Sequence, residues 1–430
     1  GRMTGVLDSR PAGAGNRVVV GEFDGTWAEL AQAPYGASSD TLTLPPAAAC
    51  LVSGHRAAAQ AAWNAALDPG RETLIATASR IGDEQAAQLR DGGLTLVRDS
   101  AGGVTLEAAT APREPEAGRI WLLTSGSTGR PKQVAHTLES LTTVGGQQPA
   151  RTWLCPYTPG AYAWWQVVTL SLTMPGQDVV FVEPSQLDEW PQQALAAGVT
   201  AASGTPTFWR QALWRNGDVL AQLKLEQITL GGEPVDQGIL DRLREVFPDA
   251  RISWIYASSE AGAAIAVHDG LAGFPETWLE REVAGRPRLS VEDGELLIAS
   301  PKAAEGMDAV IHTGDHVEIA EGRVVITGRI ASDEINVGGS KASAGAVRAV
   351  LLEHPDVAWA AVRGRKAPLV GNVVAADVVL RDGLAKGDPD APDQAALQAW
   401  CAERLPEYAV PRRVKYLSEI PIKESLKSDV

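Results

Sequence analysis

The sequence predicts an α/β protein. It has a large N-terminal domain, with mostly parallel sheets and a β-subdomain, and a small mobile α+β C-terminal domain. From residue 119 to about residue 255, short apolar runs alternate with helix-forming segments, a pattern typical of parallel α/β sheets. After Gly294 the pattern changes to short strands with glycine-containing turns. The chain has 430 residues, enough for one large and one smaller domain, and we place the boundary after Ser332, giving domains 1–332 and 333–430.

In the first domain, a helix is expected over residues 55–67, and residues 99–116 are expected to be largely loop. An apolar segment at residues 161–174 predicts a buried helix that is too short to span a membrane. The other expected elements are strands at 120–123, 179–182, 201–203, 227–230 and 252–255, and helices at 191–197 and 207–215.

In the second half, the expected strands are 295–298, 316–319 and 323–326, joined as hairpins. The small domain is expected to contain helices at 344–353 and 394–404, strands at 358–362 and 373–380, and a polar loop at 381–392. These elements together predict a compact lid.

Charge and cysteine content exclude several classes of protein. The chain carries 38 Lys and Arg against 53 Asp and Glu, a formal net charge of −15, which disfavours nucleic acid and anionic membranes as partners. Its three cysteines, Cys50, Cys155 and Cys401, are widely spaced, which argues against a disulfide framework and a cysteine-based zinc site. We therefore expect a cytoplasmic protein.

The sharpest motif is a hydroxyl-rich and glycine-rich segment over residues 124–132. It follows an expected apolar strand, and we expect a helix after it. Glycines turn backbone N–H groups toward an anion, and hydroxyls add donors. A solvated linker is the alternative, and the Walker loop is excluded because no Gly-Lys pair occurs in the chain. The residues expected to bind phosphate are Thr124, Ser125, Gly126, Ser127, Thr128, Gly129 and Lys132, with Arg130 as a second cation.

This segment resembles the signature loop of the adenylate-forming superfamily. That superfamily comprises acyl- and aryl-CoA synthetases, the adenylation domains of nonribosomal peptide synthetases and firefly luciferase. The resemblance covers residues 120–427 and is nearest to the short acyl-CoA synthetases of the o-succinylbenzoate–CoA ligase type. It implies that ATP and Mg²⁺ activate a carboxylate to an acyl-adenylate, which then passes to a thiol such as coenzyme A.

Two further segments match the nucleotide site of that superfamily. By resemblance, the ring of Tyr256 lies against adenine, Ser259 contacts phosphate and Glu260 holds Mg²⁺. Ala257 replaces the usual glycine of this motif. The adenine-side loop corresponds to Gly231, Gly232 and Glu233.

The resemblance assigns roles around the domain boundary as well. Asp315 would accept the ribose hydroxyls, and Arg329 would contact ribose or phosphate. Asp333 falls near the hinge of the superfamily. Gly338 and Gly339 resemble the loop that reaches the active site for thiol transfer, with a plain turn as the alternative.

Near the C-terminus, Lys427 follows Pro421 at the spacing of the catalytic lysine of the superfamily. By resemblance, this lysine bridges the carboxylate and the α-phosphate during adenylation. Leu426 stands where glycine is usual, and Lys423 is the competing candidate.

The sequence leaves the acid and the acceptor open. Trp164, Trp165, Phe208 and Trp209 lie near regions that line the acyl pocket in relatives, which favours an aryl or short branched acid of secondary metabolism. Packing in the core or at a homodimer interface is the alternative for each. The acceptor is coenzyme A, a carrier-protein thiol or an amine.

Functions other than activation of a carboxylic acid differ in the motifs that they require. One alternative activates an oxyanion such as nitrite for diazotisation of an aryl amine. A binding protein with a decayed site is disfavoured by the intact motifs, and a serine hydrolase by the lack of Gly-x-Ser-x-Gly.

Overall fold

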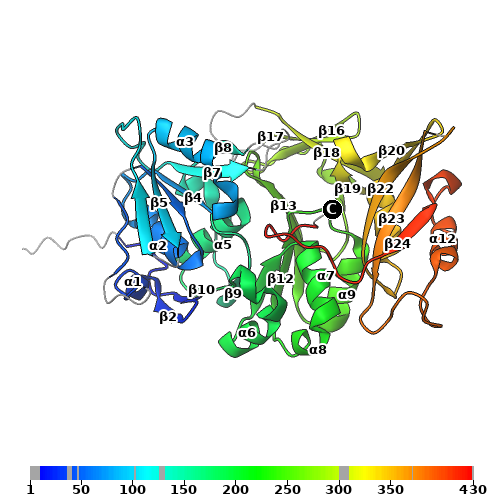
Figure 1. Cartoon of the computed structure of the whole chain (residues 1–430), viewed down its shortest axis with the longest axis horizontal. Helices are drawn as coiled ribbons and strands as arrows, with labels where there is room; N and C mark the ends of the chain where they lie inside the picture. The colour runs from blue at the N-terminus through cyan, green and yellow to red at the C-terminus, as the bar shows by residue number, and fades with distance from the viewer. Residues whose placement is uncertain are drawn as a thin grey trace, which may run out of the picture.

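The computed structural model describes residues 10–35, 41–45, 48–100, 103–124, 131–299, 309–369 and 371–428. The described residues form four sheets. Two belong to the N-terminal α/β part, a third is an antiparallel β-subdomain, and the fourth forms the C-terminal unit at the orange and red end of the chain (Figure 1). The predicted α/β class, with a large part and a smaller C-terminal part, is confirmed.

The first sheet has the order β6-β5-β3-β4-β7-β8 and is parallel from β5 to β7. Its alternating buried side chains meet helix α3 on one face, and α2 lies toward the neighbouring sheet. The strands are β3 (Ala49–Val52), β4 (Thr73–Ala76), β5 (Thr95–Ser100), β6 (Gly103–Glu107), β7 (Ile120–Thr124) and β8 (Lys132–His136). The helices are α2 (His55–Leu67), η1 (Ala78–Arg80) and α3 (Asp83–Asp91).

The second sheet has the order β14-β13-β12-β11-β9-β10-β1-β2, with parallel pairing from β13 to β1 and antiparallel edges. Its strands are β1 (Arg17–Val20), β2 (Phe23–Thr26), β9 (Arg151–Cys155), β10 (Gln177–Phe181), β11 (Ala201–Gly204), β12 (Gln227–Gly231), β13 (Arg251–Ser258) and β14 (Gly262–Val267). The helices around it are α1 (Trp27–Leu30), α4 (Leu138–Leu141), α5 (Tyr162–Thr173), η2 (Pro184–Glu189), α6 (Trp190–Ala197), α7 (Pro206–Arg215), α8 (Gly217–Leu220) and α9 (Gln237–Val246).

The antiparallel β-subdomain has the order β15-β19-β18-β17-β16. Its elements are β15 (Phe274–Pro275), η3 (Glu276–Trp278), β16 (Arg288–Glu292), β17 (Glu295–Ala299), β18 (Ile311–Ala320) and β19 (Arg323–Arg329). A short helix, α10 (Ile330–Asp333), leads from β19 into the C-terminal unit.

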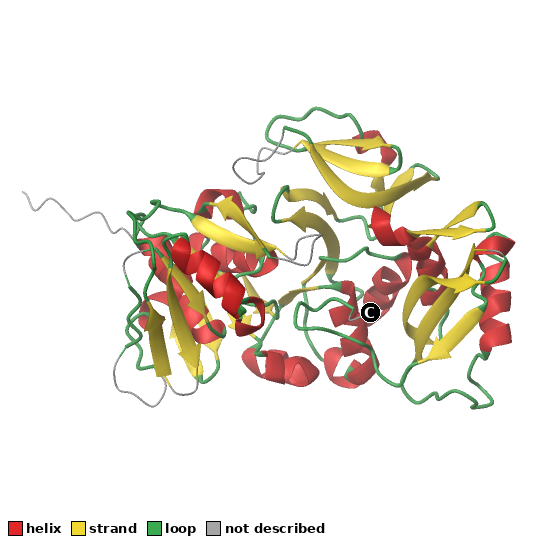
Figure 2. Ribbon diagram, turned by 45° about the horizontal axis from the view of Figure 1, so that its top comes forward, coloured by secondary structure: helices red, strands yellow, loops and turns green. Residues whose placement is uncertain are grey.

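In the C-terminal unit, hereafter the small domain (residues 334–428), β23 pairs with β22 on one side and with β20 and β24 on the other. Helices α11 and α12 cover one face of this sheet, and α12 lies outermost (Figure 2). The elements are β20 (Glu334–Val337), β21 (Ser340–Ser343), α11 (Ala344–Leu352), β22 (Val357–Ala367), β23 (Gly371–Leu380), α12 (Gln394–Ala402), η4 (Glu407–Ala409) and β24 (Arg413–Tyr416). The exact boundary after Ser332 stays a prediction.

Most expected elements are present within one to a few residues, and α2 has the expected bounds. Two expectations were wrong. The segment after the glycine-rich loop is the strand β8, because Val134 and His136 are buried at alternate positions, the period of a strand. The expected loop at 99–116 contains β6. This edge strand is almost entirely exposed, so burial imposes little apolar pattern on its sequence.

Two arginines, the buried Arg210 and the half-buried Arg242, join the small domain to the large one. Arg210 of α7 is 1% exposed, pairs with Asp236 at 2.6 Å and donates to the Ala358 carbonyl at 3.2 Å. Burial lowers the pKa of Arg210 to about 10. Arg242 of α9 donates to the Val357 carbonyl at 2.7 Å. Guanidinium groups directed at carbonyls stabilise this orientation of the small domain, because each carbonyl would otherwise lose its partner.

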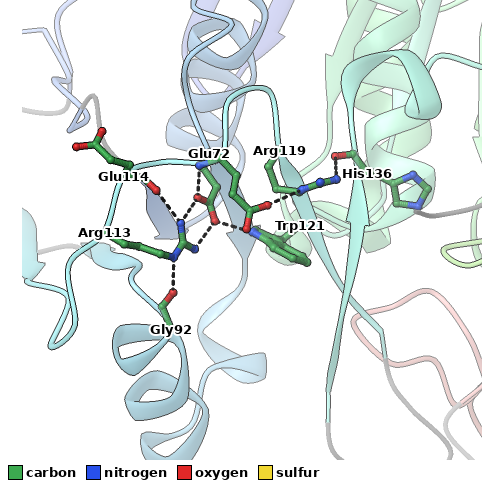
Figure 3. A network of polar contacts seen from close by, with 8 residues as sticks. Glu72, Gly92, Arg113, Glu114, Arg119, Trp121 and His136 are labelled. Carbon is green, nitrogen blue, oxygen red and sulfur yellow. Dashed lines mark hydrogen bonds and ion pairs between the residues drawn. The ribbon is translucent and has the colours of Figure 1, made fainter. Parts of the chain in front are cut away.

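A second buried charge, Glu72 beside β4, anchors the approach to the glycine-rich loop (Figure 3). Its carboxylate accepts two hydrogen bonds from Arg113, at 2.7 and 2.8 Å, and one each from the Glu116 backbone and the Trp121 indole, at 2.8 and 2.9 Å. These bonds together lower the pKa of Glu72, although burial alone would raise it. Glu72 therefore ties the segment before β7 to the sheet.

We predict that Glu72→Gln lowers the free energy of unfolding by about 2–3 kcal/mol at pH 7, because an amide donor would then face the Arg113 guanidinium. Glu116→Gln is the matched control, since its ion pair with Arg119 is exposed and worth at most about 1 kcal/mol. Denaturant titration measures both. Equal losses in the two variants would contradict the anchoring role of Glu72.

Candidate active site

The predicted phosphate loop is held by a β-hairpin. Strands β7 and β8 pair in antiparallel register, with Thr124 opposite Lys132. The hydroxyl of Thr124 is buried and has no hydrogen-bond partner among the described residues, which leaves it available to a ligand. Lys132 is exposed on the other strand, directly opposite Thr124. The remaining predicted loop residues lie outside the described part of the chain: Ser125, Gly126, Ser127, Thr128, Gly129 and Arg130.

A residue that the sequence analysis missed, His136, connects this hairpin to the predicted metal and phosphate residues. His136 is 1% exposed at the end of β8. Its Nε2 atom lies at the backbone carbonyl of Ser259, and its Nδ1 atom is 2.7 Å from the Ser140 hydroxyl. A carbonyl can only accept, so we assign the proton to Nε2. Burial lowers the pKa of His136, which favours the neutral ring. The sequence of β8, Lys-Gln-Val-Ala-His, shows no alternation of polar and apolar residues that could have indicated this contact.

The residues predicted to contact the nucleoside lie together. Tyr256 of β13 donates its hydroxyl hydrogen bond to the Asp315 carboxylate, which is 9% exposed. Arg329 lies 3.3 Å from the other carboxylate oxygen and donates to the Thr313 carbonyl at 2.7 Å. Burial, followed by the negative charge of Asp315, raises the pKa of Tyr256. The ring of Tyr256 thus comes from β13, the carboxylate of Asp315 from β18 and the guanidinium of Arg329 from the end of β19.

Ser259 and Glu260 are half-buried in the turn between β13 and β14. In the described part of the chain, no group of three or more His, Cys, Asp or Glu side chains could hold a metal. One protein carboxylate together with substrate phosphate oxygens is a normal Mg²⁺ environment. Glu260 fits a site of that kind, in which the nucleotide supplies the other ligands.

Lys427 reaches the predicted adenine-side loop from the far end of the chain, where the red segment crosses from β24 toward α7 and β13 (Figure 1). A Cβ atom on Gly232 would lie 3.8 Å from the Lys427 Cε atom, and Gly232 has a φ of +88°. Lys427 is exposed at the surface, but surrounding protein removes enough water from its ammonium group to lower its pKa. Glu233 opposes that effect with its negative charge.

The structure does not bring every predicted residue to this place. Gly338 and Gly339 form the exposed turn between β20 and β21, both with positive φ. Asp333 is 2% exposed and receives hydrogen bonds on both carboxylate oxygens, among them Ser343 at 2.8 Å and the Gly345 backbone at 2.7 Å. Asp333 therefore fastens the junction between β19 and the small domain, and its hinge role stays a prediction.

The aromatic residues near the predicted acyl pocket belong to the core. Trp164, Trp165 and Trp209 are fully buried, and Phe208 is 2% exposed. They pack with one another and with neighbouring rings, as the packing alternative predicted. An aromatic wall around the acid is therefore not supported by these four side chains.

Comparisons with known proteins identify the family of the chain. The AMP-binding enzyme family matches residues 47–307, and the AMP-binding enzyme C-terminal domain matches residues 347–427. This chain belongs to the AMP-binding enzyme family, as the resemblance to the adenylate-forming superfamily implied. It is similar to 2-succinylbenzoate–CoA ligase of Geobacillus kaustophilus, with 27% identity over 338 residues, 70% of this chain and 65% of the relative. The chain thus spans less than two thirds of that relative's length.

Two solved structures share the fold. The amide bond synthetase McbA from Marinactinospora thermotolerans is 21% identical, with a TM-score of 0.68, over 97% of this chain and 96% of that one. The o-succinylbenzoate coenzyme A synthetase from Bacillus subtilis, in complex with ATP and magnesium ion, is 20% identical, with a TM-score of 0.65, over 96% and 95%. In the described residues, no helix is long and apolar enough to cross a membrane.

We predict that the imidazole of His136 titrates below its ordinary value of 6.5. A depressed pKa means that protonation disfavours the folded state, so wild type loses stability as the pH falls below 6.5. His136→Gln keeps a donor for the Ser259 carbonyl without this titration. The unfolding midpoint of the variant, relative to that of wild type, should therefore rise as the pH is lowered from 7 to 5. A constant difference over that range would contradict the assignment.

Proposed function

We propose that this chain activates a carboxylic acid with ATP, forming an acyl-adenylate and pyrophosphate, and then transfers the acyl group to a thiol such as that of coenzyme A. The observation that carries the proposal is the seating of Lys427 beside Gly232, opposite the Tyr256 and Asp315 pair. A cation delivered from the end of the small domain to a nucleotide site suits a reaction that develops negative charge there.

The nucleotide would lie between β13 and the β-subdomain. Its base would stack on Tyr256, the ribose hydroxyls would bind Asp315 in place of the Tyr256 hydroxyl, and Arg329 would contact ribose or phosphate. Its phosphates would meet Thr124, whose buried hydroxyl has no partner among the described residues. Glu260 would hold Mg²⁺, whose chemistry here is to neutralise phosphate charge.

In the first step, a carboxylate oxygen of the acid attacks the α-phosphorus. A bond forms between this oxygen and the α-phosphorus. The bond from the α-phosphorus to the bridging oxygen breaks, and pyrophosphate leaves with the electron pair. No proton has to move, so catalysis depends on placing the reactants and on compensating charge. Lys427 supplies an ammonium group between the carboxylate and the α-phosphate.

In the second step, the thiol loses its proton to solvent and its sulfur bonds to the acyl carbon, while the bond from that carbon to the phosphate oxygen breaks and AMP leaves with the electron pair. The thiol must therefore reach a carbon beside which Lys427 is seated in the first step. We propose that the small domain pivots near Asp333, withdraws Lys427 and presents the exposed Gly338 and Gly339 turn. A turn of two glycines lets a narrow pantetheine arm pass close to the backbone. The named activity of the ligase relative supports coenzyme A as the acceptor.

The acid remains to be identified, and an ATP–pyrophosphate exchange screen over aryl and short branched acids is the direct test. Nitrite and candidate amine acceptors belong in the same panel, because they represent the alternative chemistries. Exchange with nitrite and with no carboxylic acid would replace the proposed reaction by oxyanion activation.

We predict that Lys427→Ala slows adenylate formation about 10²- to 10³-fold, the usual loss on removing one preorganised charge-stabilising group. Thioester formation from supplied acyl-adenylate should be spared, since Lys427 has left the site by then. Lys415→Ala is the control, because Lys415 is an exposed lysine of β24 in the same domain and has no proposed role in the site. If both half-reactions fell equally in Lys427→Ala, the two-orientation scheme would be wrong.

We also predict that Glu260→Gln raises the Mg²⁺ concentration needed for half-maximal adenylation at least tenfold, because a neutral amide binds this cation weakly. The measurement is pyrophosphate exchange at increasing Mg²⁺ with saturating ATP. Glu292→Gln, an exposed glutamate in the β-subdomain, serves as the control. An unchanged Mg²⁺ titration in Glu260→Gln would remove the metal role from this residue.

A further inference from the structure

The residue before Lys427 departs from the superfamily motif, and its conformation shows the consequence. Leu426 has a φ of +66°, in the left-handed region that glycine adopts without strain. A leucine there costs about 1–2 kcal/mol of backbone strain, so another interaction must offset it.

The side chain of Leu426 supplies that interaction. It is 0% exposed and packs in the hydrophobic core of the large domain, which otherwise runs from Val18 to Val324 among the described residues. Most other buried apolar side chains of the small domain lie in two separate clusters, one under helices α11 and α12 and one around Trp359. Leu426 therefore crosses the domain boundary and occupies a place in its neighbour's core.

The backbone on either side of Lys427 is held by the first turn of α7. Thr205, the N-cap of α7, donates its hydroxyl to the Leu426 carbonyl in a buried hydrogen bond. Thr207, which is fully buried, lies 2.9 Å from the Ser428 hydroxyl. The large domain therefore grips both the residue before and the residue after the lysine.

Glu233 links the first turn of α7 to the C-terminal segment. One carboxylate oxygen accepts from the Thr207 backbone and the other from the Ser428 backbone, each at 3.1 Å. On the small-domain side, the indole of Trp359 donates to the Ser428 hydroxyl at 3.2 Å. Glu233, assigned by resemblance to the adenine side, thus also fixes the segment that carries Lys427.

We infer that Leu426 is a positioning residue: its side chain anchors the C-terminal segment in the large-domain core, and Thr205, Thr207 and Glu233 orient that anchored segment so that Lys427 faces the nucleotide site. The inference rests on the proposed function for the role of Lys427. The anchor itself is independent of that function. Where the superfamily motif has a flexible glycine, this chain holds the lysine through a leucine that must leave the core whenever the small domain pivots.

Hydrogen exchange tests the anchor without any substrate. In Leu426→Ala, backbone exchange of the peptide 423–428 should rise at least tenfold, because a buried leucine is lost while the positive φ remains. Leu369→Ala is the matched control, since Leu369 has a φ of +73° and a fully exposed side chain. Thr207→Val should raise exchange in the same peptide about threefold to tenfold, as expected for one hydrogen bond. Unchanged exchange of 423–428 in both Leu426→Ala and Thr207→Val would overturn the inference.

A kinetic readout distinguishes positioning from general stability. With an acid identified by the exchange screen, Leu426→Ala should lower kcat for adenylate formation at least tenfold while thioester formation from supplied acyl-adenylate is unchanged or faster. Thr169→Val, a buried threonine of α5, controls for stability loss. Equal loss of both half-reactions would refute the positioning role. If no acid or oxyanion supports adenylation but exchange rises as expected, the proposed function fails and the anchor stands.

Discussion

The site depends on the bridge that Glu233 makes between two backbone N–H groups, those of Thr207 and Ser428. One N–H belongs to the first turn of a large-domain helix and the other to the last described residue of the chain, so a single carboxylate fixes the C-terminal segment against the nucleotide side. Charge-assisted hydrogen bonds of this kind are strong and directional. Without the bridge, the segment that carries Lys427 would lose its hydrogen bonds to the large domain, and the proposed nucleotide site would lose the group that orients its proposed cation.

The rest of the structure sets up this contact from both sides. Parallel strands of the eight-stranded sheet place the ends of β12 and β13 side by side, bringing the Gly232 loop near Tyr256. The antiparallel β-subdomain adds Asp315 from β18 across the same opening. Arg210 and Arg242 hold the small domain against α7 and α9 through carbonyls of its β22 strand. The proposed catalysis by positioning would need all three units, because none carries the complete set of groups.

An anchored lysine and a pivoting domain make opposing demands. Burial of Leu426 and the grip on Ser428 favour the orientation in which Lys427 is seated. The proposed withdrawal of Lys427 would expose that leucine and break those hydrogen bonds, which would cost free energy, although it would relieve the strain of a positive φ. The balance between these terms would set how readily the second half-reaction follows the first. A glycine at this position, as in the superfamily motif, would tilt the balance toward rotation.

Local patterns in the sequence determined the helix α2, most strands of the parallel sheets and the residue types of the nucleotide site, because periodicity and short motifs are encoded by neighbouring residues. The sequence does not distinguish β8 from a helix, because the segment is short and its pairing with β7 is not encoded in its own composition. Only the tertiary structure decided that His136 meets the Ser259 carbonyl, that Glu233 grips Ser428 and that Leu426 enters the core of the other domain. The hydrogen bonds at these places join residues from about 120 to 220 positions apart, and only the packed fold brings such partners within bonding distance.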